Sequence, residues 1–184
     1  GFFEFREAIK SNDRRIVKNT LRLEEGKYQL DFEDLENKAA DTNNKILILC
    51  NPHNPVGRVW TKTELERIAE ISTQNNLFVI ADEIHGDFVY PPHRYVPYLT
   101  ISEKATMNAA ACISPAKTFN IAGMVDAMTI IPFEAHRHKF HEFAHRYQIN
   151  KINVFTTIAT EAAYRDGAEW LDELIIYLQG NVDL

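Results

Sequence analysis

The chain has 184 residues, of which 45% are hydrophobic and 25% charged, enough for one ordinary domain with a sizeable core. Its formal net charge of −6 argues against the basic surface that a nucleic-acid or membrane-surface binder needs. No apolar stretch approaches the roughly 20 residues that span a bilayer. Neither nucleic acid nor membrane is therefore expected as a partner.

The first part of the chain predicts short elements separated by polar turns. Apolar residues at helical spacing predict a helix over Phe3–Ser11, and the charges within residues 1–7 argue against a signal peptide. Ile16 and Val17 are strand-like. Asp31 is expected to open a short helix as its N-cap, because an aspartate side chain accepts hydrogen bonds from the free N–H groups of a first turn.

The middle of the chain predicts a strand–helix–strand unit. Residues 45–50 form a continuous apolar run without alternation, which is typical of a strand covered on both faces of a parallel sheet. Thr61 and Glu64 form a capping box, which starts a helix before the next buried strand at residues 77–81. Such a unit is a right-handed crossover that leaves its two strands parallel.

The rest of the chain continues this alternation of strands and helices. A break between the last two helices is expected near Asp166 and Gly167, and Gly180 is expected just past the end of the last helix, where glycine is favoured. The expected elements are strands at residues 107–113 and 127–131, and helices at 133–148, 156–165 and 168–178.

Three polar residues follow the apolar runs: Asn54, Asp82 and Lys117. The carboxyl ends of parallel strands lie at one edge of an open α/β sheet, where ligands bind, so these side chains are expected to converge. A lysine amine can hold the aldehyde of pyridoxal phosphate (PLP) covalently. An ionised aspartate can keep the pyridine nitrogen protonated, and an amide can donate to the phenolate oxygen. An exposed lysine taken alone is more often only a solvated charge.

The segments that contain these residues resemble the signature blocks of fold-type I, class I and II aminotransferase-like enzymes, and more narrowly those of the cystathionine β-lyase (C–S lyase) branch. They are residues 50–60, 81–87 and 114–123, and the resemblance as a whole runs in order over nearly the whole chain. The run Asn-Pro-His-Asn-Pro-Val-Gly-Arg-Val-Trp at residues 51–60 is highly specific. The resemblance implies a three-layer α/β fold, with a mainly parallel sheet and helices on both faces.

The resemblance also implies roles for individual residues. Lys117 would be the catalytic lysine. His85 stands where aspartate aminotransferases have a tyrosine, and Val125 where many transaminases have an arginine for the cofactor phosphate. Both departures favour the lyase branch, although His85 could instead be a histidine packed beside a strand end. The expected cofactor-binding residues are Asn54, Asp82, His85, Ser114 and Lys117.

The implied activity is β-elimination at a carbon–sulfur bond, which converts cystathionine or a cysteine S-conjugate to a thiol, pyruvate and ammonia. The alternative is an aminotransferase of class I or II that transfers an amino group to a 2-oxo acid. The partner in either reaction is a small amino-acid substrate. Members of this family are usually dimers, so a homodimer is expected as well.

Members of the family are much longer than this chain, which begins at Gly1. We therefore expect a middle piece of the enzyme that is inactive by itself. Residues 1–150 are expected to form part of the large PLP-binding domain, and residues 151–184 to lead as helices toward a small C-terminal domain. The ring-stacking aromatic residue, the glycine-rich phosphate turn and the arginine for the substrate carboxylate are expected outside this stretch.

A second motif indicates a different chemistry. His141, Glu142 and His145 match the zinc-protease pattern H-E-x-x-H, which places two histidines on one helical face beside a glutamate base. No histidine follows His145, so a third ligand would have to be a carboxylate such as Glu161 or Glu169. The charged neighbours are typical of a solvated helix. A zinc hydrolase is therefore only a remote alternative, and no bound metal is expected.

The cysteines and several aromatic residues are expected in the core. Cys50 and Cys112 lie in apolar strands, where small buried side chains are more common than a disulfide, and a reducing cytoplasm is the expected setting. The aromatic residues expected in the core rather than in ring stacking are Trp60, Phe78, Phe119 and Trp170.

Overall fold

The computed structural model describes residues 3–124, 126–149 and 151–182. These residues form a sheet of strands ordered β3-β4-β5-β6 and a separate hairpin, β1-β2. In chain order the elements are α1 (Phe3–Ser11), β1 (Arg22–Glu24), β2 (Lys27–Gln29), α2 (Phe32–Ala39), β3 (Ile46–Cys50), α3 (Lys62–Gln74), β4 (Phe78–Asp82), η1 (Tyr98–Thr100), α4 (Glu103–Met107), β5 (Ala109–Ile113), α5 (Pro115–Thr118), η2 (Ala122–Met124), β6 (Met128–Ile130), α6 (Glu134–Arg146), α7 (Val154–Asp166) and α8 (Ala168–Val182).

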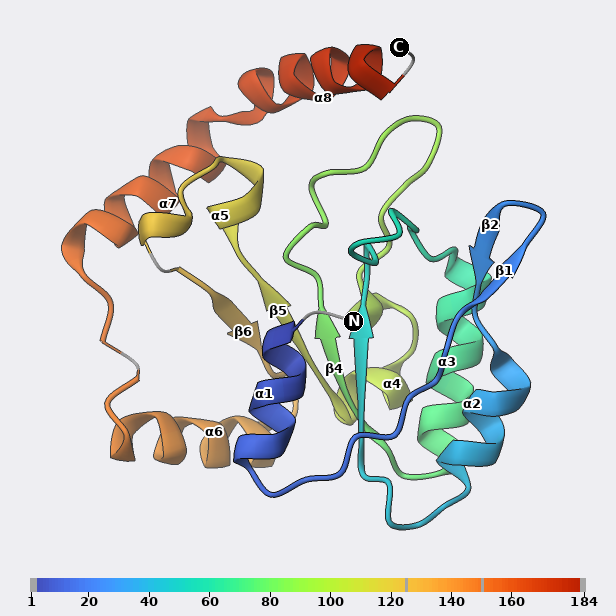
Figure 1. Ribbon diagram of the computed structural model, residues 1–184. Helices are drawn as coiled ribbons and strands as arrows, with labels where there is room; N and C mark the ends of the chain where they lie inside the picture. The colour runs from blue at the N-terminus through green and yellow to red at the C-terminus, as the bar shows by residue number, and fades with distance from the viewer. Residues whose placement is uncertain (1–2, 125, 150, 183–184) are drawn as a thin grey trace.

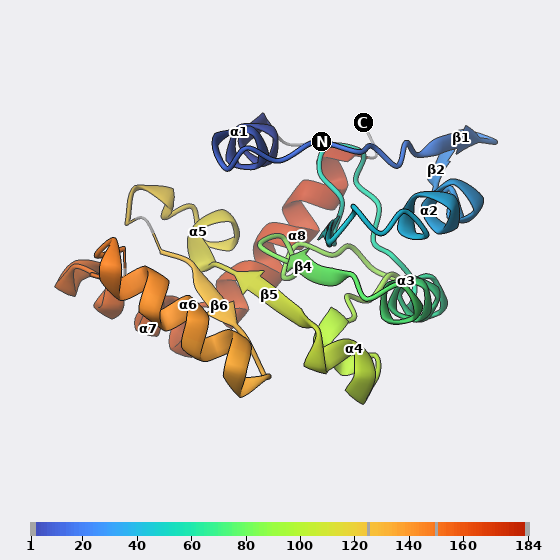
Figure 2. The same cartoon turned by 90° about the horizontal axis from the view of Figure 1, so that it is seen from below.

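The sheet is mainly parallel, as the sequence predicts. β3 pairs with β4 and β4 with β5 in parallel, whereas β6 runs antiparallel to β5 (Figure 1). The sheet lies between α1 on one side and α4 on the other (Figure 2). The three-layer α/β architecture is therefore confirmed, and the chain's parallel crossovers bring the carboxyl ends of β3, β4 and β5 to one edge.

The hydrophobic core lies on one face of this sheet. Val79 and Ala81 of β4 alternate with residues of the other face, so their side chains point the same way and are at most 1% exposed. Helix α3 packs its apolar stripe against them, including the fully buried Leu65 and the nearly buried Ile68. Trp60, which is also fully buried, joins the same cluster. This packing fixes the strands whose ends carry the polar residues.

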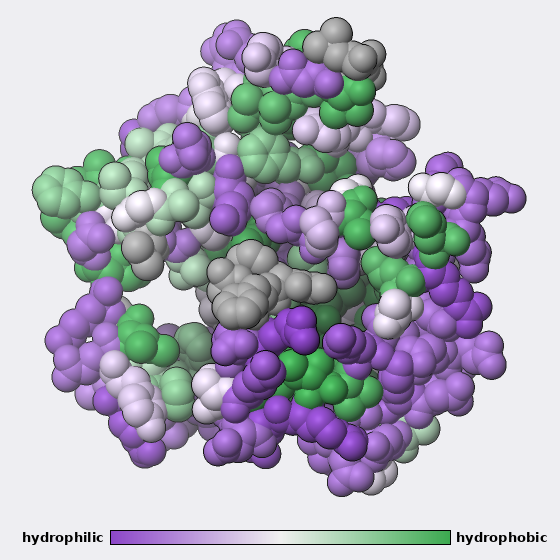
Figure 3. Space-filling view, in the orientation of Figure 1, coloured by the Kyte–Doolittle hydropathy of each residue, from purple (hydrophilic) through white to green (hydrophobic). Residues whose placement is uncertain are grey.

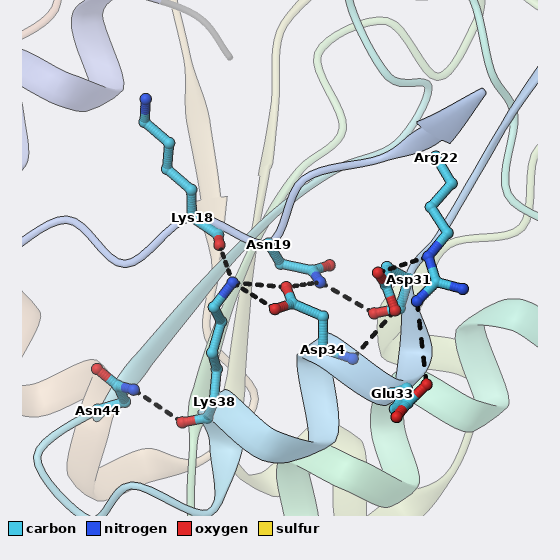
Figure 4. Close-up of polar contacts among 8 residues, drawn as sticks. All are labelled: Lys18, Asn19, Arg22, Asp31, Glu33, Asp34, Lys38 and Asn44. Carbon is cyan, nitrogen blue, oxygen red and sulfur yellow. Dashed lines mark hydrogen bonds and ion pairs between the residues drawn. The ribbon is translucent and has the colours of Figure 1, made fainter.

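Helix α2 is held to the preceding segment by a polar network (Figure 4). Asp31 is the N-cap, as predicted, and its Oδ1 accepts from the Asp34 N–H at 3.0 Å. The Asn19 Nδ2 donates to the Asp31 carbonyl at 2.9 Å and to the Asp34 Oδ2 at 2.8 Å. The Lys38 Nζ lies 2.6 Å from the same carboxylate. These contacts align the first segment without contributing to the core.

The second capping prediction is confirmed as well. The Thr61 Oγ1 accepts from the Glu64 N–H at 3.2 Å, and the Glu64 Oε2 accepts from the Thr61 N–H at 2.7 Å. This reciprocal pair satisfies two N–H groups that the first helical turn would leave free. It starts α3 directly after Trp60, so that the helix returns along the sheet to β4.

The first half of the chain differs from the prediction in three places. Residues 46–50 form the expected strand of the parallel sheet, but it is covered on both faces only toward its end, where Leu49 and Cys50 are buried, and Ile46 at its start is 56% exposed. Ile16 and Val17 form no strand. Strands β1 and β2 were not predicted, because the signal for this short hairpin lies in its turn, where Glu25 and Gly26 both have positive φ.

In the second half, the helix break at Gly167 is confirmed. A Cβ at Gly167 would lie 2.4 Å from the Phe119 ring and 2.4 Å from the Ala163 carbonyl, so only glycine fits there. Gly180 lies inside α8 rather than beyond its end, so that expectation is wrong. Trp170 is 47% exposed, not a core residue, although its ring lies 5.9 Å from that of Phe119.

Apolar side chains remain exposed on the last two helices. Ile158 of α7 is 60% exposed, and Ile176 and Tyr177 of α8 are 73% and 68% exposed. Hydrophobic residues accordingly show on the visible side of these helices (Figure 3). None of the helices among the described residues combines the length and the apolar character needed to cross a bilayer.

Candidate functional site

The three parallel strands end at the same level. In the register of the sheet Asp82 lies opposite Cys50 on one side and Cys112 on the other. The ladder continues one residue further, because the Asn51 N–H donates to the Asp82 carbonyl and the Glu83 N–H to the Cys112 carbonyl, each at 2.9 Å. Residues that follow these strands therefore begin from a common edge.

A cavity lies at this edge of the sheet. Four of the five residues predicted to bind a cofactor line it together, from three separate segments of the chain. The lining residues are Cys50, Asn54, Asp82, Ile84, His85 and Lys117. The convergence that the strand topology predicts is therefore present, and Ser114 is the one predicted residue outside this lining.

Asn54 is carried by a loop whose base is tightly held. The buried Asn51 side chain donates to the Val96 carbonyl and accepts from the Trp60 N–H, both at 3.2 Å. The Trp60 indole N–H donates to the Cys50 carbonyl at 2.9 Å. The loop then reverses at Gly57, which has φ +69°, and the Asn54–Pro55 peptide bond is cis. Exposed Asn54 thus stands at the rim of the cavity.

Asp82 is the buried carboxylate of the site, at 8% exposure. Burial raises its pKa, because desolvation disfavours the charged form. The Ile84 N–H, the nearby His85 and the Cys50 thiol oppose this effect, since each stabilises the ionised carboxylate. A cation placed in the cavity would add to these and favour the ionised form further.

His85 and Lys117 face the same cavity from two different elements. Burial lowers the pKa of His85, the positive Lys117 lowers it further, and Asp82 opposes both. Lys117 lies in the short helix α5, and it is exposed. The next residue, the fully buried Thr118, donates from Oγ1 to the Asp87 Oδ2 at 2.8 Å. This contact anchors the turn that presents the amine.

Ser114, the residue expected near a cofactor phosphate, is not among those that line the cavity. The buried Ser114 hydroxyl donates to the Asp126 carbonyl at 2.5 Å and accepts from the Ala116 N–H at 3.1 Å, so both of its functions are engaged within the chain. Val125, where many transaminases have an arginine, lies outside the described residues. A role for Ser114 toward phosphate remains a prediction.

The set of groups in the cavity fits PLP chemically. An amine, a buried carboxylate and an amide are the three functions that its aldehyde, ring nitrogen and phenolate oxygen require. Cys50 and Ile84 were missed as lining residues. Cys50 could have been found, because it ends its strand at the level of Asp82, whereas Ile84 contributes a backbone N–H that no sequence pattern marks.

The residues of the H-E-x-x-H motif lie elsewhere, on helix α6. His141, Glu142 and His145 are all exposed. Glu142 lies 3.3 Å from His138, one turn earlier on the same helix. Within residues 3–124, 126–149 and 151–182, no three His, Cys, Asp or Glu side chains are grouped to hold a metal ion. Neither Glu161 nor Glu169 completes a site with the two histidines.

Known proteins give a consistent comparison. The family model for aminotransferases of class I and II matches residues 1–181. The cystathionine β-lyase PatB of Bacillus subtilis is 39% identical over 97% of this chain and 46% of its own length. Cystalysin of Treponema denticola, solved with PLP, has a TM-score of 0.89 and 35% identity over 95% of this chain and 44% of its own. The PLP-bound C–S lyase of Staphylococcus hominis has a TM-score of 0.89 and 32% identity over 97% and 44%. The chain thus spans less than half the length of these relatives.

Proposed function

Because this chain belongs to the class I and II aminotransferase family, we propose that the full-length protein is a PLP-dependent C–S lyase. It breaks the carbon–sulfur bond of cystathionine or of a cysteine S-conjugate by β-elimination and yields a thiol, pyruvate and ammonia. The observation that carries the proposal is the shared cavity of Asn54, Asp82 and Lys117. The similarity to PatB and to the Staphylococcus hominis C–S lyase supports the lyase reaction.

The roles of the cavity residues follow from their chemistry. PLP, when bound, withdraws electrons from the bonds at the amino-acid Cα. The Lys117 Nζ holds the cofactor aldehyde before the substrate arrives. The Asp82 carboxylate keeps a proton on the ring nitrogen, and the Asn54 amide donates to the phenolate oxygen. Each function belongs to a different segment of the chain, so three segments that meet at the edge of the sheet would hold the cofactor together.

Proton transfer also belongs to Lys117. Freed from the cofactor by the substrate amine, the Lys117 Nζ would accept the proton from the substrate Cα. The electrons of the C–S bond would leave with sulfur, and water would complete the release of pyruvate and ammonia. His85 is half-buried and lines the same cavity as Asp82 and Lys117, and its burial lowers its pKa, which disfavours a second positive charge there.

An aminotransferase is the second candidate. The observation that favours it is the family model itself, which describes aminotransferases. An aminotransferase would use the same roles of Asn54, Asp82 and Lys117 up to removal of the Cα proton. It would then return a proton and pass the amino group to a 2-oxo acid, with no release of thiol.

We also propose the domain organisation, oligomeric state and setting of the full-length protein. Residues 1–150 belong to the large PLP-binding domain, and residues 151–184 lead toward a small C-terminal domain. Family resemblance supports a homodimer, and the two free thiols, Cys50 and Cys112, are consistent with a reducing cytoplasm.

One experiment separates the candidates. The full-length protein is scanned for visible absorbance with and without PLP, then given cystathionine, and free thiol and pyruvate are measured. A C–S lyase releases thiol and pyruvate in equal amounts, and it needs no added 2-oxo acid to do so. Amino transfer to an added 2-oxo acid without thiol release would establish the aminotransferase instead, and absence of a PLP spectrum would overturn both.

A further inference from the structure

Asp82 is flanked in the sheet by two cysteines. Cys50 lies opposite it on β3 and Cys112 opposite it on β5. Side chains at the same register position of neighbouring strands point to the same face, so both thiols lie beside the carboxylate. Neither cysteine has a role in the reaction described above.

The two thiols differ in what they contact. The Cys50 Sγ lies 3.8 Å from the Asp82 Oδ2 as its hydrogen-bond donor, and Cys50 also lines the cavity. Its second acceptor is the Pro52 carbonyl, at 3.3 Å. Cys112 interacts with Thr129 on β6 instead and is not among the cavity-lining residues. Of the two thiols, Cys50 is therefore the one that donates a hydrogen bond to the carboxylate.

We propose that Cys50 is a positioning residue that acts through Asp82: its thiol donates to Oδ2, holds the carboxylate toward the cavity and stabilises its ionised form. This inference rests on the proposed function, in which the ionised carboxylate faces the ring nitrogen of PLP. The thiol and the Ile84 N–H are the two hydrogen-bond donors within the described part of the chain that stabilise the ionised Asp82 carboxylate.

The state of the thiol supports this role. Burial raises the pKa of Cys50 to about 11, and the nearby Asp82 raises it as well. The thiol therefore keeps its proton at neutral pH and is a donor rather than a nucleophile. One S–H proton is shared between two acceptors, and the anionic carboxylate attracts it more strongly than the neutral Pro52 carbonyl does.

The Cys50 thiol would affect the proton for which Asp82 and the PLP ring nitrogen compete. A donor to the ionised carboxylate makes Asp82 less basic, so the proton stays on the ring nitrogen. His85 acts on this carboxylate in the same direction when positively charged, and Lys117 lines the same cavity. Without the thiol, Asp82 becomes more basic and draws the proton away from the nitrogen, which weakens the electron withdrawal that the reaction needs.

The test uses the full-length protein with Cys50→Ala, Cys50→Val and the matched control Cys112→Ala. In cofactor-free protein, a carbon-13 NMR titration follows the Asp82 carboxyl, identified by its loss in Asp82→Asn. In protein loaded with nitrogen-15-labelled PLP, the ring-nitrogen shift reports its protonation. We expect a higher Asp82 pKa and a less protonated ring nitrogen in both Cys50 variants, with turnover about three- to tenfold lower. Cys112→Ala should match the wild type in the Asp82 pKa, in the protonation of the ring nitrogen and in turnover.

Unchanged Asp82 titration and ring-nitrogen shift in the Cys50 variants would overturn the inference, even if turnover fell. The same shifts in Cys112→Ala would overturn it too, because they would indicate general loosening of the sheet. If Cys50→Ala does not fold, Cys50→Val, which fills the space without a donor, must give the expected shifts. If the wild type does not bind PLP, the proposed function fails, and the cofactor-free titration still decides the role of Cys50.

Discussion

The cavity edge of the sheet and helix α6 both bring titratable side chains together, but they differ in origin and in depth. The edge collects Asn54, Asp82 and Lys117 from three segments that follow three parallel strands. The α6 pair, His141 and His145, comes from one exposed helix. Three strands must fold together before the first group exists, whereas the second requires only a helix.

This difference shows why a short sequence motif is weaker evidence for a site than side chains that separate segments bring together. Two histidines four residues apart share a face of any helix, whatever surrounds them. A carboxylate that is 8% exposed, by contrast, must be stabilised by something, since burial of an unpaired charge is costly. The buried Asp82 carboxylate is therefore evidence for a function at the edge of the sheet, whereas helix α6 offers only the spacing of two histidines. Four substitutions test this contrast, and those of Lys117, His85 and Glu83 have a counterpart on α6.

Lys117→Ala should have the largest effect. It removes the amine that both holds the cofactor and accepts the Cα proton, so turnover should fall by at least about a thousandfold. The visible absorbance of the lysine-bound cofactor should disappear with it. The control is Lys139→Ala on α6, an exposed lysine whose loss should change neither property. Retained thiol release in the Lys117 variant would contradict its assignment.

Asp82→Asn should have the next largest effect, and a different phenotype. A neutral amide fills the same space and leaves Lys117 able to hold the cofactor, but it cannot stabilise the positive ring nitrogen. Each pK unit lost there corresponds to about 1.4 kcal/mol, so a loss of several units should slow turnover by about 10²- to 10⁴-fold. Absorbance and thiol-release assays measure the two properties separately. Near-normal thiol release would remove Asp82 from the mechanism.

His85→Asn and His141→Asn form a matched pair with a smaller expected difference. His85 is half-buried in the cavity, so we expect its replacement to weaken PLP affinity about tenfold, as loss of one well-placed contact does. His141 is exposed, and its replacement should leave affinity unchanged and stability within about 0.5 kcal/mol. Fluorescence titration with PLP measures both. Equal effects of the two changes would show that the cavity is not the binding site.

Glu83→Gln should change the pH dependence of stability. Burial raises the pKa of Glu83, so the folded protein binds this proton more tightly than the unfolded chain does. The stabilisation is complete below about pH 4.3, the ordinary value, and is lost as pH rises through the raised folded pKa, with a slope of at most about 1.4 kcal/mol per pH unit. A glutamine remains neutral and can still accept the Tyr98 N–H that Glu83 Oε1 accepts at 2.7 Å.

Denaturant unfolding of cofactor-free protein across this range measures the effect. Relative to wild type, the Glu83→Gln protein should gain stability as pH rises. Glu142→Gln on exposed α6 should follow the wild-type curve. If the Glu83 variant also follows that curve, the buried carboxyl does not titrate as proposed.

The sequence predicts the site's placement better than its contacts. Apolar runs locate β3, β4 and β5, and parallel topology then places the residues after them at one edge. The contacts that tune the carboxylate are not visible in this way, because the Ile84 N–H belongs to the backbone and the Cys50 thiol depends on strand register. Ser114 shows the same limit, since its hydroxyl is engaged by the Asp126 carbonyl.

In the fold, too, local features could be predicted from the sequence and tertiary features could not. Caps are local, so Asp31, Thr61 and Glu64 could be predicted from neighbours three residues apart. Exposure is a tertiary property, so the sequence could not show that β3 is an edge strand or that Trp170 stays partly exposed. Only glycine fits at residue 167, because the Phe119 ring occupies the space that a Cβ would need, and that ring comes from a distant part of the sequence.

The central claim is that Lys117 holds PLP at the cavity edge, and one measurement tests it directly. Full-length protein purified with PLP is treated with borohydride, which makes a lysine–cofactor bond permanent, and is then digested and examined by mass spectrometry. We predict the added cofactor mass on the peptide that contains Lys117 and on no other peptide. Its presence on a different lysine, or its absence from all peptides of a protein that shows the cofactor's absorbance, would contradict the claim.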